Sequence, residues 1–220
     1  VRIDQPLTVA EVYRLGSHGE VLLASGGRVY GFTHLNAPSA AGYAAFLADL
    51  TRRTVLLDDA NTQQNRDPIL YPLPGLSAAN TLRVGDTVSG LTAVVDYRSS
   101  AFRLQPLAVA PVFVHANPRP APLAPAGAVR VVSANVLNYF NGDGQGGGFP
   151  TSRGADTLSE FNRQRAKTIA MLTALDADVV GLIEVENDAG AAGALADLVA
   201  GLNAATGGNI YAAIDTGVLG

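Results

Sequence analysis

Asn135 and Glu184 are the two residues whose types and positions could do chemistry. Each stands at the exit of an apolar run typical of a buried strand, over residues 128–134 and 178–184. Functional groups gather where the strands of an α/β sheet end, because the loops there are exposed and the sheet holds them rigidly. The pair is therefore a candidate site. One carboxylate is too few to complete a metal centre, and an ordinary exposed strand-end acid is the alternative interpretation of Glu184.

Two further groups in the chain could bind a cation. Asp58 and Asp59 follow a strand-like run, although a hydrogen-bonded turn into Asn61 is the favoured interpretation of that pair. Residues 141–148 begin like a calcium loop, with oxygen groups at alternate positions and glycine at the sixth. Ser152 occupies the twelfth position, which requires a bidentate Glu, so we reject the calcium-loop interpretation.

The elements that must position Asn135 and Glu184 follow the order strand, glycine-rich loop, helix, strand. A capping box at residues 157–160 predicts the start of the helix. A helix is also expected over residues 190–204, and residues 210–214 are expected to open a third strand. Strand alternation predicts that one face of the second strand carries Val180, Leu182, Glu184 and Glu186.

The first 116 residues read as short strands with one helix, over residues 38–50, which is typical of a small OB-like β-barrel. Gly90 lies inside an alternating run at residues 82–95 and predicts a bend there. The other expected strands are residues 7–13, 21–24, 28–32, 52–59, 102–106 and 111–114. Aromatic residues of the helix, including Tyr43 and Phe46, are interpreted as core.

An OB-like barrel could bind single-stranded nucleic acid through aromatic and basic side chains. The side chains that could form such a face are Tyr30, Phe32, Tyr97, Phe102, Arg98 and Arg103. The favoured interpretation is that the aromatics fill the barrel and the arginines keep it soluble, because aromatic side chains mostly serve packing.

A proline-rich stretch divides the chain into two parts. Residues 117–127 contain four prolines and are expected to be an extended, stiff linker between a module at residues 1–116 and a second domain at residues 128–220. Residues 1–120 carry ten arginines against nine acids, whereas residues 121–220 carry five basic groups against ten acids. The composition therefore gives no broad basic footprint for nucleic acid. An acidic second half suits a cation site at least as well as a polyanion groove, and ordinary exposed carboxylates are the more common explanation.

The cysteine count and the hydropathy exclude several classes of protein. The chain has no cysteine, which rules out disulfides, zinc-thiolate sites and thiol catalysis and leaves the compartment open. No apolar run approaches the roughly 20 residues of a membrane helix. The first residue is not Met and no signal peptide is present, so we expect a piece of a longer protein.

Four segments together resemble the bacterial secreted extracellular nuclease family. They are Val-Ser-Ala-Asn-Val-Leu-Asn-Tyr-Phe (residues 132–140), Arg-Gly-Ala-Asp (153–156), Glu-Phe-Asn-Arg-Gln-Arg-Ala-Lys (160–167) and Asp-Val-Val-Gly-Leu-Ile-Glu-Val-Glu-Asn (178–187). This family is a branch of the endonuclease/exonuclease/phosphatase superfamily, which has the DNase I-like fold. The resemblance implies a mixed fold, in which an all-β OB-like barrel precedes a partial α+β DNase I-like four-layer sandwich.

By this resemblance, Glu184 matches the magnesium-ligand glutamate of the superfamily and Asn135 the asparagine of its first strand. Both are therefore expected to be catalytic and metal-site residues, with Mg²⁺ as the cofactor and Mn²⁺ or Ca²⁺ as alternatives. The implied activity is metal-dependent hydrolysis of DNA, or of RNA. Two residues depart from the pattern: Ile183 replaces the usual Gln, and Leu137 stands where many relatives carry an acid.

The superfamily's later motifs, which supply catalytic Asp, Asn and the general-base His, would lie after Gly220. We therefore expect the chain to be inactive alone, with the missing carboxy-terminal part of the same protein as one partner. The resemblance also implies an extracellular or periplasmic location. A phospholipid or sugar-phosphate phosphodiesterase of the same superfamily and a non-catalytic single-strand-binding protein are the alternatives.

Overall fold

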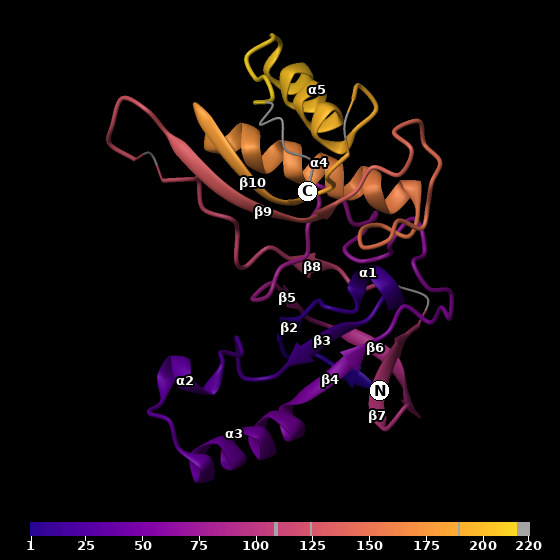
Figure 1. Ribbon diagram of the computed structural model, residues 1–220. Coiled ribbons are helices and arrows are strands. Elements are labelled where there is room, and N and C mark those ends of the chain that lie inside the picture. The colour runs from indigo at the N-terminus through magenta and orange to yellow at the C-terminus, as the bar shows by residue number, and fades with distance from the viewer. Residues whose placement is uncertain (108–109, 124, 189, 215–220) are drawn as a thin grey trace. The chain divides into compact units, whose positions relative to one another are not determined.

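The computed structural model describes residues 1–107, 110–123, 125–188 and 190–214 (Figure 1). The chain forms two compact units, Val1–Arg119 and Pro120–Gly220, and the division between them falls inside the proline-rich stretch. Each unit contains a hydrophobic cluster of its own. The two units are therefore described separately.

The first unit is built on a curled sheet of eight strands, in the order β1-β6-β7-β4-β3-β2-β5-β8. All pairings are antiparallel except that of β4 with β7. The sheet forms a half-barrel, so the prediction of a β-rich first module is confirmed at this level. The strands are β1 (Arg2–Ile3), β2 (Leu7–Glu11), β3 (Val21–Ala24), β4 (Thr54–Leu57), β5 (Thr87–Val88), β6 (Leu91–Arg98), β7 (Ala101–Pro106) and β8 (Phe113–Val114).

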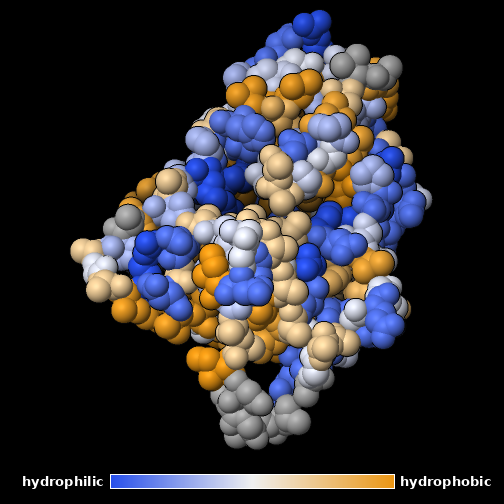
Figure 2. Space-filling view, turned by 90° about the horizontal axis from the view of Figure 1, so that it is seen from above, coloured by the Kyte–Doolittle hydropathy of each residue, from blue (hydrophilic) through white to orange (hydrophobic). Residues whose placement is uncertain are grey.

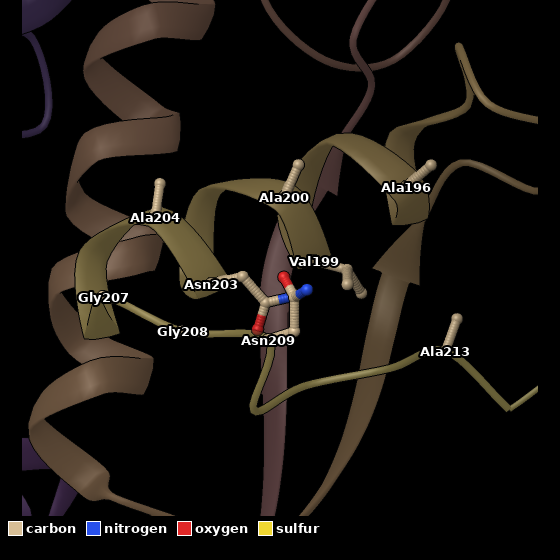
Figure 3. A pocket seen from close by; sticks show the side chains of 9 residues that line it. All are labelled: Ala196, Val199, Ala200, Asn203, Ala204, Gly207, Gly208, Asn209 and Ala213. Carbon is tan, nitrogen blue, oxygen red and sulfur yellow. The ribbon is translucent and has the colours of Figure 1, made fainter.

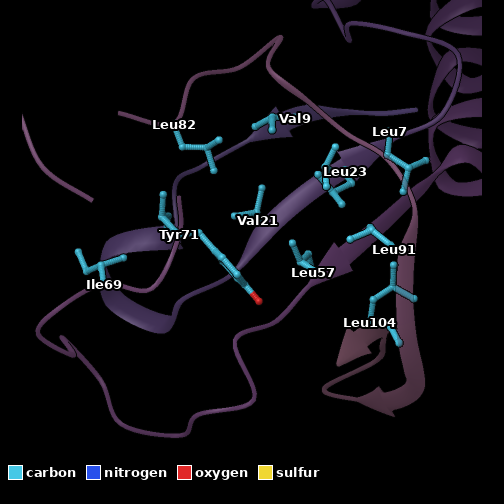
Figure 4. Packing of buried hydrophobic residues seen from close by; sticks show 13 residues of the cluster. Leu7, Val9, Val21, Leu23, Leu57, Ile69, Tyr71, Leu82, Leu91 and Leu104 are labelled. Atoms are coloured by element: carbon cyan, nitrogen blue, oxygen red, sulfur yellow. The ribbon is translucent and has the colours of Figure 1, made fainter. Parts of the chain in front are cut away.

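Aliphatic side chains from most of these strands pack into one buried cluster (Figure 4). Val9, Val21 and Leu23 are fully buried, as expected for β-branched and aliphatic residues at alternate strand positions. Tyr71 enters the same cluster from the long loop between β4 and β5. The predicted bend at Gly90 is confirmed, because this residue has a φ of 66° and separates β5 from β6.

A buried ion-pair cluster, formed by Arg103, Glu20 and Asp58, lies in the same unit. The Arg103 guanidinium donates to the Glu20 carboxylate and, at 3.0 Å, to Asp58. All three side chains are almost completely buried, so removing one partner would leave an uncompensated buried charge. Arg103 is thus a structural residue, which corrects both the favoured interpretation that it keeps the barrel soluble and the alternative that it contacts nucleic acid. The interpretation that the aromatics fill the barrel is also wrong for Tyr97 and Phe102, which are exposed.

The helices of the first unit are α1 (Leu15–His18), α2 (Phe32–Leu35) and α3 (Ala40–Arg53). The prediction that the aromatics of α3 belong to the core is wrong, because α3 has no buried residue. Instead Phe32, Tyr43 and Phe46 pack against one another, with ring centroids 5.9–6.2 Å apart. The buried cluster of this unit contains no residue of α3.

Residues 28–32 were expected to form a strand and do not. Gly26 and Gly27 both have positive φ, so the chain turns away after β3, and Phe32 begins α2 instead. Propensity alone predicted this strand, but a strand needs a neighbour to pair with.

The second unit contains the predicted strand–loop–helix–strand order. Strands β9 (Val131–Tyr139) and β10 (Val179–Val185) pair in parallel, from Val131↔Val179 to Ile183↔Asn135. Helices α4 (Leu158–Leu175) and α5 (Ala194–Thr206) supply much of the core of this unit. Its buried side chains are Val136, Tyr139, Ala155, Phe161, Leu172, Ala194, Leu198 and Leu202.

The third strand expected at residues 210–214 is absent, since this segment has no strand pairing in the part of the chain that the structure describes. Asn203 holds it instead: its amide oxygen accepts from the backbone N–H groups of Ile210 and Tyr211, at 2.9 and 2.8 Å. These N–H groups are therefore not directed to a neighbouring strand.

The predicted N-cap of α4 is confirmed at Thr157, whereas the reciprocal bond of the capping box reaches the residue before the N-cap, Asp156. The Thr157 hydroxyl accepts from the Glu160 N–H at 3.2 Å, and the Glu160 carboxylate accepts from the Asp156 N–H at 2.8 Å. These bonds satisfy donors that have no partner within the helix.

Candidate functional site

Asn135 lies near the end of β9, on the face of the strand turned away from the core. Alternation along β9 places Val136 in the core and leaves Asn135 and Leu137 exposed. The Asn135 amide oxygen accepts from the Leu137 N–H at 2.8 Å. Leu137 and Asn138 both adopt left-handed conformations, with φ of 58° and 50°, so the strand bends just after Asn135.

Glu184 lies near the end of β10, at a break in the strand register between Ile183 and Val185. It has a φ of 64°, a conformation that L residues rarely adopt. Val180 packs against the core, whereas Glu184 is exposed. The prediction that Glu184 shares a face with Val180 is therefore wrong, because the irregularity reverses the alternation.

The two strand ends bring the predicted site residues together. The Asn135 amide nitrogen donates to one Glu184 carboxylate oxygen (Oε1) at 2.7 Å. Glu184 is exposed, and within the described residues its other oxygen has no hydrogen-bond partner. The amide thus orients the carboxylate and leaves one oxygen open toward solvent.

Asn135 and Glu184 offer one carboxylate between them. Within the described residues, no group of three or more His, Asp or Glu side chains is placed to hold a metal ion. Glu184 can therefore supply a single carboxylate ligand, and any further ligands would be water or the oxygens of a bound substrate.

Gln164 of α4 supports the bent end of β9. Its amide nitrogen donates to the carbonyl oxygens of Val136 and Leu137, at 3.0 and 2.6 Å. The bend turns these carbonyls away from regular strand pairing, and the Gln164 amide satisfies them. Nothing in the local sequence pattern indicated this contact.

The second unit contains a further polar network, formed by Tyr139, Arg165 and Asp197. The Tyr139 hydroxyl donates to Asp197 at 2.6 Å, and Arg165 Nε lies within 3.0 Å of both Asp197 oxygens. Burial, and then the hydrogen bond to Asp197, raise the pKa of the Tyr139 hydroxyl above its usual range. An arginine on the otherwise apolar face of the predicted helix was the signal that could have revealed this network.

The glycine-rich loop that follows β9 is held by its own backbone. The Asp143 carboxylate accepts from the N–H groups of Gln145 and Gly147, both at 2.8 Å, and these bonds lower its pKa. Asn141 is buried, and its amide nitrogen donates to the Ala192 carbonyl at 2.8 Å. Asp143 therefore closes a turn, which agrees with the rejection of a calcium loop.

Glu186, two residues beyond Glu184, lies in a different environment. Burial raises the pKa of the Glu186 carboxyl, and the nearby Asp188 raises it further. One carboxylate oxygen of Glu186 is inaccessible to solvent and has no hydrogen-bond partner in the described residues. Glu186 therefore favours the protonated form more than an ordinary glutamate does.

Asp58 and Asp59 behave as the sequence predicted. Their carboxylates accept from the N–H groups of Ala60 and Asn61, at 2.9 and 3.0 Å, which closes the expected turn. Asp58 is also part of the buried ion-pair cluster.

The second unit also has a hollow of about 680 Å³ beside α5, lined largely by small side chains and backbone (Figure 3). None of its described lining residues is acidic or basic. Large apolar side chains are also exposed outside this hollow. Figure 2 shows hydrophobic patches, in orange, between hydrophilic ones, in blue, on one face of the molecule.

A scan against protein-family models and searches of curated proteins and solved structures found no match to this chain. No relative therefore assigns a role to Asn135 or Glu184.

No helix in the described part of the chain is long and apolar enough to cross a membrane.

Proposed function

We propose that this protein takes part in divalent-metal-dependent hydrolysis of phosphodiester bonds in DNA, with RNA as the alternative substrate. One observation carries the proposal: an amide and a carboxylate meet at 2.7 Å at the ends of two parallel strands, and among the described residues the second carboxylate oxygen has no partner. Oriented carboxylates at strand ends are typical of sites built on a rigid sheet.

The donor set fits Mg²⁺ or Mn²⁺ better than Ca²⁺. Mg²⁺ keeps several waters and is held by one or two carboxylates together with substrate phosphates, whereas Ca²⁺ takes six to eight oxygen ligands. Glu184 would ligate the cation through its open oxygen. A cation bound there would act as a Lewis acid on the phosphodiester.

Asn135 would orient Glu184. Its amide nitrogen donates to Glu184 and its oxygen accepts from the Leu137 N–H, so both ends of the amide are engaged. Hydrolysis also needs a group that activates water, and the three histidines of the chain, His18, His34 and His115, all belong to the first unit. Asn135 and Glu184 are thus one part of a catalytic site.

The motif resemblance supports the same proposal at the level of the family. We assign the chain to the bacterial secreted extracellular nucleases, with an OB-like first module and a second unit that begins a DNase I-like sandwich. An extracellular or periplasmic location belongs to this proposal and rests on the resemblance alone.

Cleavage of DNA and RNA by the natural gene product tests the proposal. We expect cleavage that needs Mg²⁺ or Mn²⁺ and that Glu184→Gln abolishes. Asn135→Ala should reduce activity roughly 10- to 100-fold, the usual effect of losing a group that orients a metal ligand. Glu11→Gln, which changes an exposed glutamate at the end of β2, is the control. Full activity in the Glu184→Gln variant would contradict the proposal.

A further inference from the structure

A tight turn at residues 151–155, shortly before α4, is held by the side chain of Thr151. The Thr151 hydroxyl donates to the Ala155 carbonyl and accepts from the Gly154 N–H, both at 3.0 Å. The Thr151 N–H also donates to the Ala155 carbonyl, at 3.0 Å. Ala155 is buried in the core of the second unit, which anchors the end of the turn. We call residues 151–155 the threonine turn.

The threonine turn packs directly against the bend that follows Asn135. A Cβ atom added at Gly154 would lie 2.7 Å from the Asn138 carbonyl oxygen and 3.1 Å from the Phe140 Cβ. A backbone oxygen cannot come that close to a real side chain, so only glycine allows this approach. The turn therefore lies where β9 ends.

The same place adjoins the end of β10. Tyr139, which follows Asn138 in the chain, pairs with Val185, the residue after Glu184. The Tyr139 carbonyl also accepts from the Glu186 N–H at 3.1 Å. The threonine turn thus contacts the segment of β9 that lies beside the end of β10. Ligands of parallel sheets bind outside these carboxyl ends.

Arg153 stands at the apex of the threonine turn and is exposed. Among the described residues it has no hydrogen-bond or ion-pair partner. Arg130 and Arg165 of the same unit are instead paired with Asp176 and Asp197. A side chain on a rigid backbone loses less freedom on binding than one on a flexible loop. Arg153 is thus a cation that the fold presents beside the strand ends without neutralising it.

We infer that Arg153 binds a phosphate next to the scissile one, so that the site is built for a polynucleotide strand. A guanidinium matches the geometry of phosphate and binds it through two parallel N–H bonds. The residues of the bend lie between Asn135 and the threonine turn, so Arg153 and Glu184 serve different phosphates of one strand. The inference rests on the proposed function and specifies its substrate, because a diester with a single phosphate leaves Arg153 without a ligand.

Kinetics of the natural gene product with Mg²⁺ compare DNA with bis(p-nitrophenyl) phosphate, a diester that has one phosphate. Arg153→Gln should raise the KM for DNA roughly 10-fold, as the loss of a hydrogen bond to a charged group does, and leave kcat unchanged. It should not alter kcat/KM for the small diester. Arg130→Gln, which removes an exposed arginine just before β9, is the control and should change neither substrate. An equal loss on both substrates would overturn the inference.

Binding of a short fluorescent DNA duplex, measured in EDTA at low salt, tests the contact without catalysis. Arg153→Gln should lower the slope of log affinity against log salt by about one, whereas Arg130→Gln should retain the slope. Arg153 is exposed, so thermal melting of the variant should equal that of the natural chain. An unaltered slope, or no binding of DNA by the natural chain, would overturn the inference. Cleavage that survives in Glu184→Gln would instead contradict the proposed function, and the binding measurement does not depend on it.

Discussion

At the scale of single residues, the candidate site contains backbone conformations that residues other than glycine rarely adopt. Glu184, Leu137 and Asn138 are all left-handed, and they flank the Asn135–Glu184 hydrogen bond. Each such residue costs roughly 1–3 kcal/mol and persists only where the surroundings impose it. Gln164 is one of those surroundings, since it binds the carbonyls of the bend. Strain at this place is consistent with a functional role for the pair.

Glu186 provides a pH-dependent test at this scale. Its folded-state pKa is raised, so the folded chain binds the proton more tightly than the unfolded chain. The natural chain therefore loses stability as pH rises from the ordinary glutamate pKa to the raised value. Glu186→Gln should be more stable than the natural chain above that window, and the difference should shrink as pH falls. Urea unfolding at several pH values measures it, and a difference that does not vary with pH would contradict the assignment.

The residues of the site could be predicted from the sequence, but their geometry could not. Polar groups after apolar runs identified Asn135 and Glu184, because strand ends meet at one edge of a parallel sheet. Strand alternation predicted the wrong face for Glu184. The break in register belongs to the pairing of β10 with β9, which the sequence of β10 alone does not reveal. The contact from Gln164 joins residues 27 and 28 positions apart, and only the fold brings them together.

At the scale of elements, local signals predicted helix starts and bends well. Thr157 caps α4 as expected, and Gly90 separates β5 from β6. Predictions failed where pairing or burial by other elements decides the outcome. Residues 28–32 and 210–214 have the composition of strands but no strand beside them, and α3 has an apolar face that the core does not use.

The cap of α4 gives the second prediction. Thr157→Ala removes the hydroxyl that accepts from the Glu160 N–H, and we expect a loss of about 1 kcal/mol in the free energy of unfolding. Thr157→Ser keeps the hydroxyl and should retain most of the stability. Denaturant unfolding of both variants provides the measurement. Equal stability of the Ala and Ser variants would show that the cap contributes nothing.

At the scale of the whole molecule, the chain is two units joined by a proline-rich stretch. Its composition predicted this division, because prolines can neither continue a helix nor join a central strand. Leu123, in the middle of the stretch, is 93% exposed. The two parts differ in basic residues more than in acids: residues 1–120 carry ten arginines against nine acids, and residues 121–220 carry five basic groups against ten acids. The proposed cation site belongs to the second unit alone.

Limited proteolysis tests the division. Thermolysin, which cuts before large apolar residues, should cleave first at Leu123, because exposed connecting segments without regular structure are the preferred sites. Mass spectrometry should then identify two fragments, residues 1–122 and 123–220, which separate the two units within a few residues of their boundary. Earlier cleavage within β9 or β10 would contradict the description of the second unit as compact.

The central claim is that Glu184 binds a divalent cation. Binding of Mn²⁺, followed by electron paramagnetic resonance, tests it most directly and requires no catalytic activity. The natural chain and the Glu11→Gln control should bind one Mn²⁺ that Mg²⁺ displaces, Asn135→Ala should bind roughly 10- to 100-fold more weakly, and Glu184→Gln should not bind at this site. Equal Mn²⁺ binding by the natural chain and Glu184→Gln would contradict the account.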